Sequence, residues 1–149
     1  MENLIADSVS GGHHYLPADR VNWPDVRSVT LIQNKNLGDA VLLLPVIGKL
    51  RELLPSVTIQ IITNLTNAPI FQGFENLTFH KYARSLAGTA GLFHDLRGQE
   101  VVLDFQPSVR HRALARLCQV PVRSGLAGGV ALSRHDTHPV PWRASVSRH

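Results

Sequence analysis

Short runs of apolar and β-branched residues alternate along the chain with longer segments in which apolar positions recur every three or four residues. The short runs predict buried strands, and the longer segments predict helices that bury one side. The predicted strands are residues 28–33, 57–62, 77–80, 100–105 and 120–123. The predicted helices are residues 39–54, 66–74, 89–96 and 108–119. Strands that alternate with helices indicate an α/β fold with a mostly parallel sheet covered on both faces.

The predicted helix at residues 39–54 contains a proline near its start. Pro45 lacks an amide hydrogen, so we expect it to bend the helix locally. Residues 42–44 make the first turns apolar on nearly all sides, and we therefore expect that end of the helix to be buried. Pro55 marks the end of the helix.

Periodicity and composition divide the chain into three segments. Residues 1–25 carry glycines and prolines without a period and indicate an irregular leader that lacks the features of a signal peptide. Residues 26–125 form the expected domain, and residues 126–149 resemble a linker toward an absent C-terminal domain. The only cysteine, Cys118, lies in an apolar helical pattern, which favours a packed small side chain over a nucleophile. The absence of cysteine pairs favours a cytoplasmic location.

Charge narrows the choice of partners. The formal net charge is +4, and much of the excess lies between Arg110 and Arg148. This balance suits a partner that carries phosphate or carboxylate, including the surface of an anionic membrane, and it equally suits plain solubility. No basic stretch is interleaved with stacking aromatic residues, so no nucleic-acid partner is expected. Asn64 and Asn76 begin Asn-Leu-Thr triplets that match the glycosylation pattern, and without an export signal they indicate chance matches.

The loop after the first predicted strand, residues 33–39, is the best candidate site. In a parallel sheet it lies at the carboxyl end of the strand, where ligands bind. Gly38 permits close approach of the backbone and unusual dihedral angles, and Lys35 can hold an anion. Asp39 is either the N-cap of the following helix or a general base for a hydroxyl group. With one glycine and no Gly-Lys-Ser/Thr, the loop matches neither a dinucleotide fingerprint nor a P-loop, and no cofactor is expected.

Three further groups of residues could carry chemistry. Asp104, at the end of a predicted strand, can bind hydroxyl groups, or it can be a solvated or helix-capping carboxylate. A basic stretch in the next helix either meets phosphate groups or forms a solvated face; its residues are Arg110, His111, Arg112 and Arg116. The run His135-Asp136-Thr137-His138 superficially resembles metal ligands but has no third organised ligand, so no metal site is expected.

Two stretches carry a resemblance to a known family. The first, VTLIQNKNLGDAVLLLPVIGKLRELLPSVTIQII with its Leu37-Gly38-Asp39, Pro45 and Pro55, resembles the opening of glycosyltransferase family 9, the heptosyltransferases. The second, VVLDFQPSVRHRALARLCQVPVRSGL, resembles a later signature of that family. Its matching residues are Asp104, Gln106, Ser108, Arg123 and Gly125. The resemblance covers residues 26–125, and it departs at Gln33, where many members carry Arg or Lys.

The resemblance implies a GT-B fold, in which two Rossmann-like domains face a cleft, with the acceptor held by the N-terminal domain and the nucleotide-sugar donor by the C-terminal one. Typical members transfer heptose from ADP-heptose to the inner core of lipopolysaccharide, with inversion. For this chain we expect a cytoplasmic location with a peripheral contact at the inner membrane. Members are about twice as long as this chain, which would therefore be the acceptor half alone. The resemblance makes Asp39 the catalytic base. The implied substrate-binding residues are Lys35, Asn36, Gly38, Asp104, Gln106 and Arg123.

Two other functions stay open. The chain can be a catalytically inactive, truncated domain that binds an anionic glycan or a protein partner, because the donor half of the family is missing. It can also be a flavodoxin-like domain that uses the loop at residues 33–39 for a phosphate.

Overall fold

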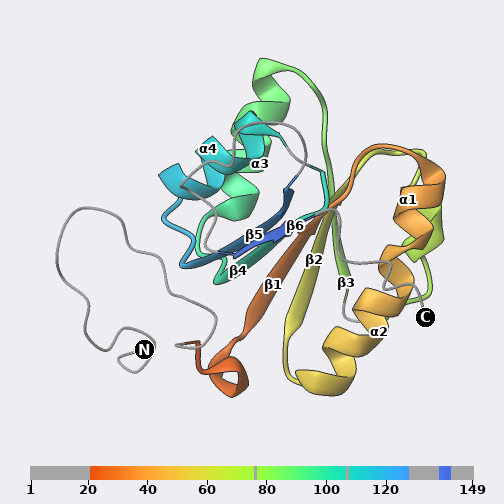
Figure 1. Ribbon diagram of the computed structural model, residues 1–149. Coiled ribbons are helices and arrows are strands. Elements are labelled where there is room, and N and C mark those ends of the chain that lie inside the picture. Colours follow the sequence, from red (N-terminus) through yellow and green to blue (C-terminus); the bar gives the residue numbers. More distant parts are fainter. Residues whose placement is uncertain (1–20, 76, 107, 128–137, 142–149) are drawn as a thin grey trace, which may run out of the picture.

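Six parallel strands form one sheet in the order β3-β2-β1-β4-β5-β6 (Figure 1). The computed structural model describes residues 21–75, 77–106, 108–127 and 138–141, with the backbone alone for 125–127 and 138–141. The strands are β1 (Ser28–Ile32), β2 (Thr58–Thr63), β3 (Leu77–Lys81), β4 (Val101–Asp104), β5 (Val122–Ala127) and β6 (His138–Pro141). The strand order reverses between β1 and β4, and the crevice of a Rossmann-like sheet opens at such a reversal. The predicted α/β fold is confirmed.

Helices cover both faces of the sheet, as expected (Figure 1). They are α1 (Leu37–Val41), α2 (Leu43–Leu53), α3 (Leu86–Leu96) and α4 (Val109–Leu117), with short 3-10 turns η2 (Trp23–Asp25) and η3 (Ala68–Phe71). Side chains of a strand alternate between faces, so Leu31 packs with α1 and α2 while Ile32 packs with α3 and α4. The central strands therefore bury apolar side chains on both faces, with Thr30 and Gln60 as buried polar exceptions, which explains the short apolar runs in the sequence.

The predicted helix at residues 39–54 is two helices that meet at Leu42. Pro45 has no amide hydrogen to donate to the carbonyl group four residues earlier, and it lies instead in the first turn of α2, where none is needed. The expected burial of residues 42–44 is wrong. Leu43 is buried, but Leu42 is 68% exposed, and Leu37 and Val41 of α1 are exposed as well.

Other boundaries differ from the expected ones for local reasons. Helix α3 begins at Leu86, three residues before Thr89, because the Ser85 hydroxyl accepts a hydrogen bond from the amide of Gly88 at 3.0 Å. Only the four-residue turn η3 forms within the predicted helix at residues 66–74. Val21 is already buried, although it precedes residue 26. The end of β5 and the whole of β6 carry the sheet beyond Gly125, into the segment expected to be a linker.

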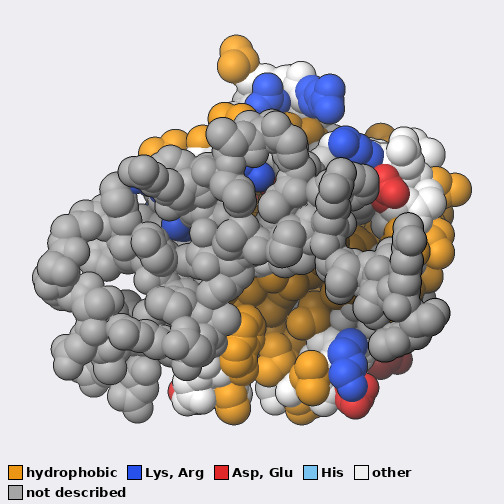
Figure 2. All heavy atoms as spheres, in the orientation of Figure 1, with side chains coloured by type: hydrophobic (Ala, Val, Ile, Leu, Met, Phe, Trp, Pro, Cys, Tyr) orange, Lys and Arg blue, Asp and Glu red, His pale blue; other side chains and the backbone are white. Residues whose placement is uncertain are grey.

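Apolar side chains line the surface near the amino ends of β1 and β2. An apolar hollow of about 240 Å³ lies where β1 and β2 begin; its lining residues are Pro24, Val26, Leu53, Leu54, Pro55, Ser56 and Val57. Figure 2 shows hydrophobic side chains gathered in the lower middle of the molecule, with Lys and Arg side chains at the top, near the start of α3, and also at the lower right. The described residues contain no helix that is long and apolar enough to cross a membrane.

We predict that Gly88→Ala destabilises the protein although alanine is the better helix former. A Cβ atom at position 88 would overlap the backbone carbonyl of Ala83. Overpacking of this kind costs about 1–3 kcal/mol, which exceeds the gain of about 0.8–1.0 kcal/mol from helix propensity. Urea unfolding measures the difference. Gly91→Ala in the same helix is the control, because a Cβ atom there meets nothing within 4 Å and should stabilise the protein.

We predict that Cys118 reacts slowly with iodoacetamide in the folded protein. Its Sγ lies 3.3 Å from the carbonyl oxygen of Phe93. Burial raises the pKa of the Cys118 thiol, and the positive charge of Arg97 offsets part of this shift. A raised pKa leaves less thiolate at pH 8, so the rate should increase on unfolding in urea and with pH in the folded protein. An equal rate in folded and unfolded protein would contradict this.

Candidate functional site

The loop after β1 and the turn after β4 meet at the carboxyl edge of the sheet. Ile32 and Asp104 are partners at the ends of these neighbouring strands. Backbone pairing continues past the strand ends, since the amide of Phe105 donates to the carbonyl of Ile32 at 3.1 Å and that of Gln33 to Ile62 at 3.0 Å. The loop at residues 33–36 therefore starts from a fixed point at the reversal of the strand order.

Side-chain amides hold the next two residues of this loop. The amide of Asn34 donates to Oε1 of Gln106 and that of Lys35 to Oε1 of Gln33, both at 3.3 Å. Nδ2 of Asn64 donates to the carbonyl of Asn34 at 2.9 Å and to that of Lys35 at 3.0 Å. Nδ2 of Asn67 adds a bond to the Lys35 carbonyl at 3.3 Å. Uncharged side chains thus satisfy both backbone groups of both residues.

The predicted site residues of this loop lie on the surface. Lys35, Asn36 and Gly38 are exposed, and Asn36 is the residue that caps α1. Asn36 caps the helix without a side-chain hydrogen bond. Gly38 has ordinary helical geometry, so the expected unusual dihedral angles are absent. A Cβ atom at Gly38 would meet nothing within 4 Å, and this side of the loop is therefore open.

Asp39 is the third residue of α1, so the interpretation of Asp39 as the N-cap is wrong. Its side chain is half-buried. Within the described part of the chain its carboxylate makes no hydrogen bond or ion pair. A carboxylate at the start of a helix, partly exposed and without a protein partner, can accept a proton or a hydrogen bond from a bound molecule.

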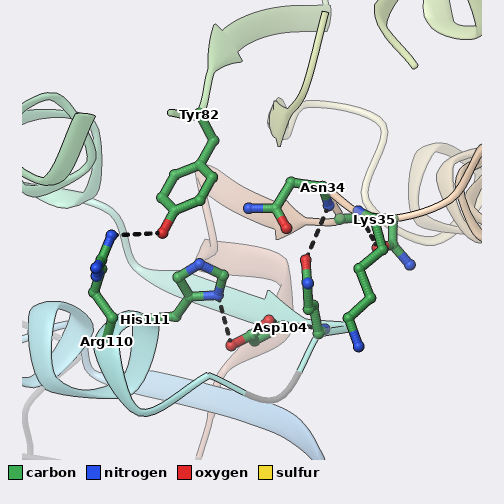
Figure 3. Close-up of polar contacts among 8 residues, drawn as sticks. Asn34, Lys35, Tyr82, Asp104, Arg110 and His111 are labelled. Atoms are coloured by element: carbon green, nitrogen blue, oxygen red, sulfur yellow. Dashed lines mark hydrogen bonds and ion pairs between the residues drawn. The ribbon is translucent and has the colours of Figure 1, made fainter. Parts of the chain in front are cut away.

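Asp104 lies in the interior and has two partners. Its Oδ1 accepts a hydrogen bond from the amide of Gln106 at 2.9 Å, and its Oδ2 lies 3.2 Å from Nδ1 of His111 (Figure 3). Asp104 is 7% exposed and His111 is 2% exposed. The interpretations of Asp104 as a solvated or helix-capping carboxylate are therefore wrong, and Ser108 caps α4 instead. In this contact we assign Nδ1 of His111 as the donor and Oδ2 of Asp104 as the acceptor.

The basic stretch of α4 does not form a single solvated face. His111 points into the protein toward Asp104, while Arg110 is exposed and its Nη1 donates to the hydroxyl of Tyr82 at 3.2 Å (Figure 3). The Tyr82 and His111 rings meet edge to face with centroids 5.3 Å apart. Tyr82 and the Asp104–His111 pair thus connect the carboxyl ends of β3 and β4 through α4.

Arg123 lies beneath this surface. It is buried on β5, its Nη1 donates to the carbonyl of Val120 at 3.0 Å, and its strand partner is Val102 of β4. Together with Asp104 and His111 it lines a cavity of about 10 Å³, which is close to the room that one water molecule needs.

The sequence did not point to several polar residues at this edge. The missed residues are Asn34, Asn64, Asn67, Tyr82 and His111 in its buried role. His111 precedes the buried Leu114 and Ala115 by three and four residues, and this helical spacing is a signal for its burial. Nδ2 of Asn34 is buried without a partner in the described ranges, so it is a donor whose hydrogen atoms are unused there. Nothing in the sequence marks Asn34 as such a donor.

Metal binding finds no support in the described ranges. His, Cys, Asp and Glu side chains there form no group of three that could hold a metal ion. The run His135-Asp136-Thr137-His138 lies outside the side chains that the structure describes.

Comparisons with known proteins connect the fold to solved glycosyltransferases. No protein-family model and no curated protein matches the sequence. A glycosyl transferase of family 9 from Veillonella parvula matches with a TM-score of 0.56 and 18% identity, over 66% of this chain and 31% of that one. The E. coli heptosyltransferase WaaC, solved with ADP, matches with a TM-score of 0.54 and 18% identity, over 66% of this chain and 34% of that one.

This likeness confirms the Rossmann-like fold that the resemblance implied. The chain spans about a third of the length of the two solved structures.

We predict that His111→Ala destabilises the protein by about 1–3 kcal/mol, because it leaves the buried Asp104 carboxylate without one of its partners. Urea unfolding measures the effect. His94→Ala is the matched control, since the His94 side chain is 88% exposed and its loss should change stability by no more than about 0.5 kcal/mol. Equal effects of the two substitutions would show that the Asp104–His111 contact contributes nothing.

Proposed function

We propose that this chain is the acceptor-side half of an inverting glycosyltransferase that transfers heptose from ADP-heptose to an acceptor resembling the lipopolysaccharide core. One observation carries the proposal: Asp39 presents a carboxylate without a partner among the described residues, just after a loop in which the backbone groups of Asn34 and Lys35 are hydrogen-bonded. The fold likeness to a family 9 glycosyl transferase and to a heptosyltransferase supports it. A fixed base beside an open surface suits the activation of a sugar hydroxyl group.

In the proposed reaction Asp39 takes the proton of an acceptor hydroxyl group. The hydroxyl oxygen forms a bond to the anomeric carbon of the heptose as the bond from that carbon to the diphosphate oxygen breaks, and ADP leaves with the electron pair. Attack from the face opposite ADP inverts the anomeric centre. The proton then passes from Asp39 to solvent. General base catalysis of this kind increases the reaction rate by about 10²–10⁴-fold.

The other predicted residues have two kinds of role in this proposal. Lys35, Asn36 and Gly38 line the open side of the loop, where an acceptor and its anionic groups would bind. Nδ2 of Asn34 offers a hydrogen bond to an acceptor hydroxyl group. The buried residues shape the floor beneath them; these are Asp104, Gln106 and Arg123.

In this proposal the donor site belongs to a second domain outside residues 1–149. The nucleotide-sugar is bound there in the proposal, so the chain by itself would bind the acceptor and not ADP. The net charge of +4 is compatible with an anionic acceptor and with the peripheral contact at the inner membrane that we propose for this chain in the cytoplasm. No cofactor, metal ion or nucleic acid takes part in the proposed reaction.

A second candidate is a catalytically inactive domain that binds an anionic glycan or a protein. The exposed apolar side chains of Leu37, Val41 and Leu42 favour it, because such a patch beside the site loop suits a covering partner. A titration of the 149-residue chain with a phosphorylated core oligosaccharide and with ADP, followed by NMR, tests the domain assignment. The oligosaccharide should shift the signals of residues 34–39, whereas tight binding of ADP would contradict the assignment.

We predict that Asp39→Asn, in an enzyme completed with a donor domain, lowers heptose transfer by about 10²–10⁴-fold. The amide cannot accept the proton, and it should leave the free energy of unfolding unchanged within about 0.5 kcal/mol because Asp39 has no described partner. The release of ADP measures the rate. Asp25→Asn, before β1 at the opposite edge of the sheet, is the control that should retain transfer. A rate like the wild type in Asp39→Asn removes the assignment of the base and leaves the inactive binding domain.

A further inference from the structure

We propose that Asn64 is a positioning residue of this site, which holds the loop after β1 and thereby sets the place of Asp39. The inference rests on the proposed function for its consequence, but the contacts that carry it belong to the unliganded chain. Asn64 follows β2 directly and lies beside the loop across the carboxyl edge of the sheet.

Both ends of the Asn64 side-chain amide form hydrogen bonds to the backbone. Nδ2 has two hydrogen atoms, and it donates to two consecutive carbonyls, those of Asn34 at 2.9 Å and Lys35 at 3.0 Å. Oδ1 accepts from the amide of Asn67 at 2.9 Å. Carbonyl groups cannot donate and the Asn67 amide cannot accept, so these neighbours determine which end of the amide faces the loop. Neither aspartate nor serine can make the same set of bonds.

A second residue, Asn67, contacts both Asn64 and the loop after β1. Asn67 is fully buried, and its own Nδ2 donates to the Lys35 carbonyl at 3.3 Å. The Lys35 carbonyl therefore uses both of its acceptor sites on these two asparagines. The amide of Ala68 also donates to the Asn64 carbonyl at 3.2 Å, which ties the start of η3 to the same residue. The turn after β2 and the loop after β1 thus form one hydrogen-bonded unit.

The position of Asp39 follows from this unit. Asn36, directly after Lys35, caps α1, and its carbonyl accepts from the amide of Ala40 at 3.1 Å. Helix α1 has only five residues and is separated from α2 at Leu42, so two features fix its direction: the burial of Ala40 in the core and the way the chain enters the helix at Asn36. A misplacement of a catalytic group by about 1 Å can lower a rate by about 10²-fold. By binding the carbonyls of Asn34 and Lys35, directly before the cap of α1, Asn64 limits such a displacement of Asp39.

The same contacts give a structural meaning to the Asn64-Leu65-Thr66 triplet. Both hydrogen atoms of the Asn64 amide are used inside the protein, so this asparagine is not presented as an acceptor for a glycan. Thr66 is exposed. Thr66→Ala therefore removes the triplet and keeps the hydrogen bonds of Asn64, which makes it a matched control.

The test uses the 149-residue chain without any sugar. Amide hydrogen exchange and ¹⁵N relaxation are measured by NMR for the wild type, Asn64→Ser and Thr66→Ala. We expect the amides of Lys35 and Ala40 to exchange about tenfold faster in Asn64→Ser, relative to those of Val102 and Leu103 in β4. Residues 34–39 should also show microsecond-to-millisecond exchange broadening in that variant. Thr66→Ala should match the wild type in both measurements.

Two results would overturn the proposal. One is a folded Asn64→Ser protein in which exchange and relaxation at residues 34–40 equal those of the wild type. The other is a uniform acceleration across the loop and β4, which indicates a general loss of stability and no positioning. If Asn64→Ser does not fold, hydrogen exchange in the wild type tests the proposal. The side-chain amide hydrogens of Asn64 should exchange about tenfold slower than those of the exposed Asn36. Equal exchange rates would overturn the proposal.

Failure here and failure of the proposed function are distinguishable. Loop order is read without substrate, whereas the role of Asp39 is read from ADP release in Asp39→Asn. If the loop is ordered as expected but Asp39→Asn transfers heptose at the wild-type rate, only the glycosyltransferase mechanism is contradicted.

Discussion

Hydrogen bonds between side-chain amides and the backbone of Asn34 and Lys35 are the constraint on which the site depends. A loop at a sheet edge must satisfy its amides and carbonyls, and here Gln33, Asn64, Asn67 and Gln106 do so from the ends of three strands. Because these groups are uncharged, they hold the loop without placing a counter-charge beside Asp39. In the proposed function, these hydrogen bonds position the Asp39 carboxylate.

The sheet makes this arrangement possible through its strand order. β1 has β2 on one side and β4 on the other, so the loop that follows it is reached by residues from both neighbours. The amide of Asn34 is held from the β4 side and its carbonyl from the β2 side. Residues about 30 and 72 positions away in the sequence therefore act on one backbone unit. A crevice at such a reversal is where sheets of this kind bind ligands.

Burial separates the polar residues of the edge into two layers. The Asp104–His111 pair and Arg123 lie inside, around a cavity with room for about one water molecule. Lys35, Asn36 and the half-buried Asp39 lie outside. The inner layer suits a structural role, in which buried polar groups satisfy one another, and the outer layer suits contact with a bound acceptor. This division gives the proposed transferase a rigid floor under an open surface.

Apolar periodicity determined the α/β class, the positions of the first five strands along the chain and the positions of α2 and α4, because local burial leaves a direct imprint on the sequence. It also marked the loop after β1, since a polar loop with Gly38 and Asp39 after an apolar strand can be recognised locally. The tertiary structure decided four other features. These are the helix break at Leu42, the exposure of Leu42, the burial of His111 and the hydrogen bond from Asn64 to the Lys35 carbonyl. Each of these features depends on contacts between residues that are far apart in the chain. Such contacts produce no periodic pattern in the sequence.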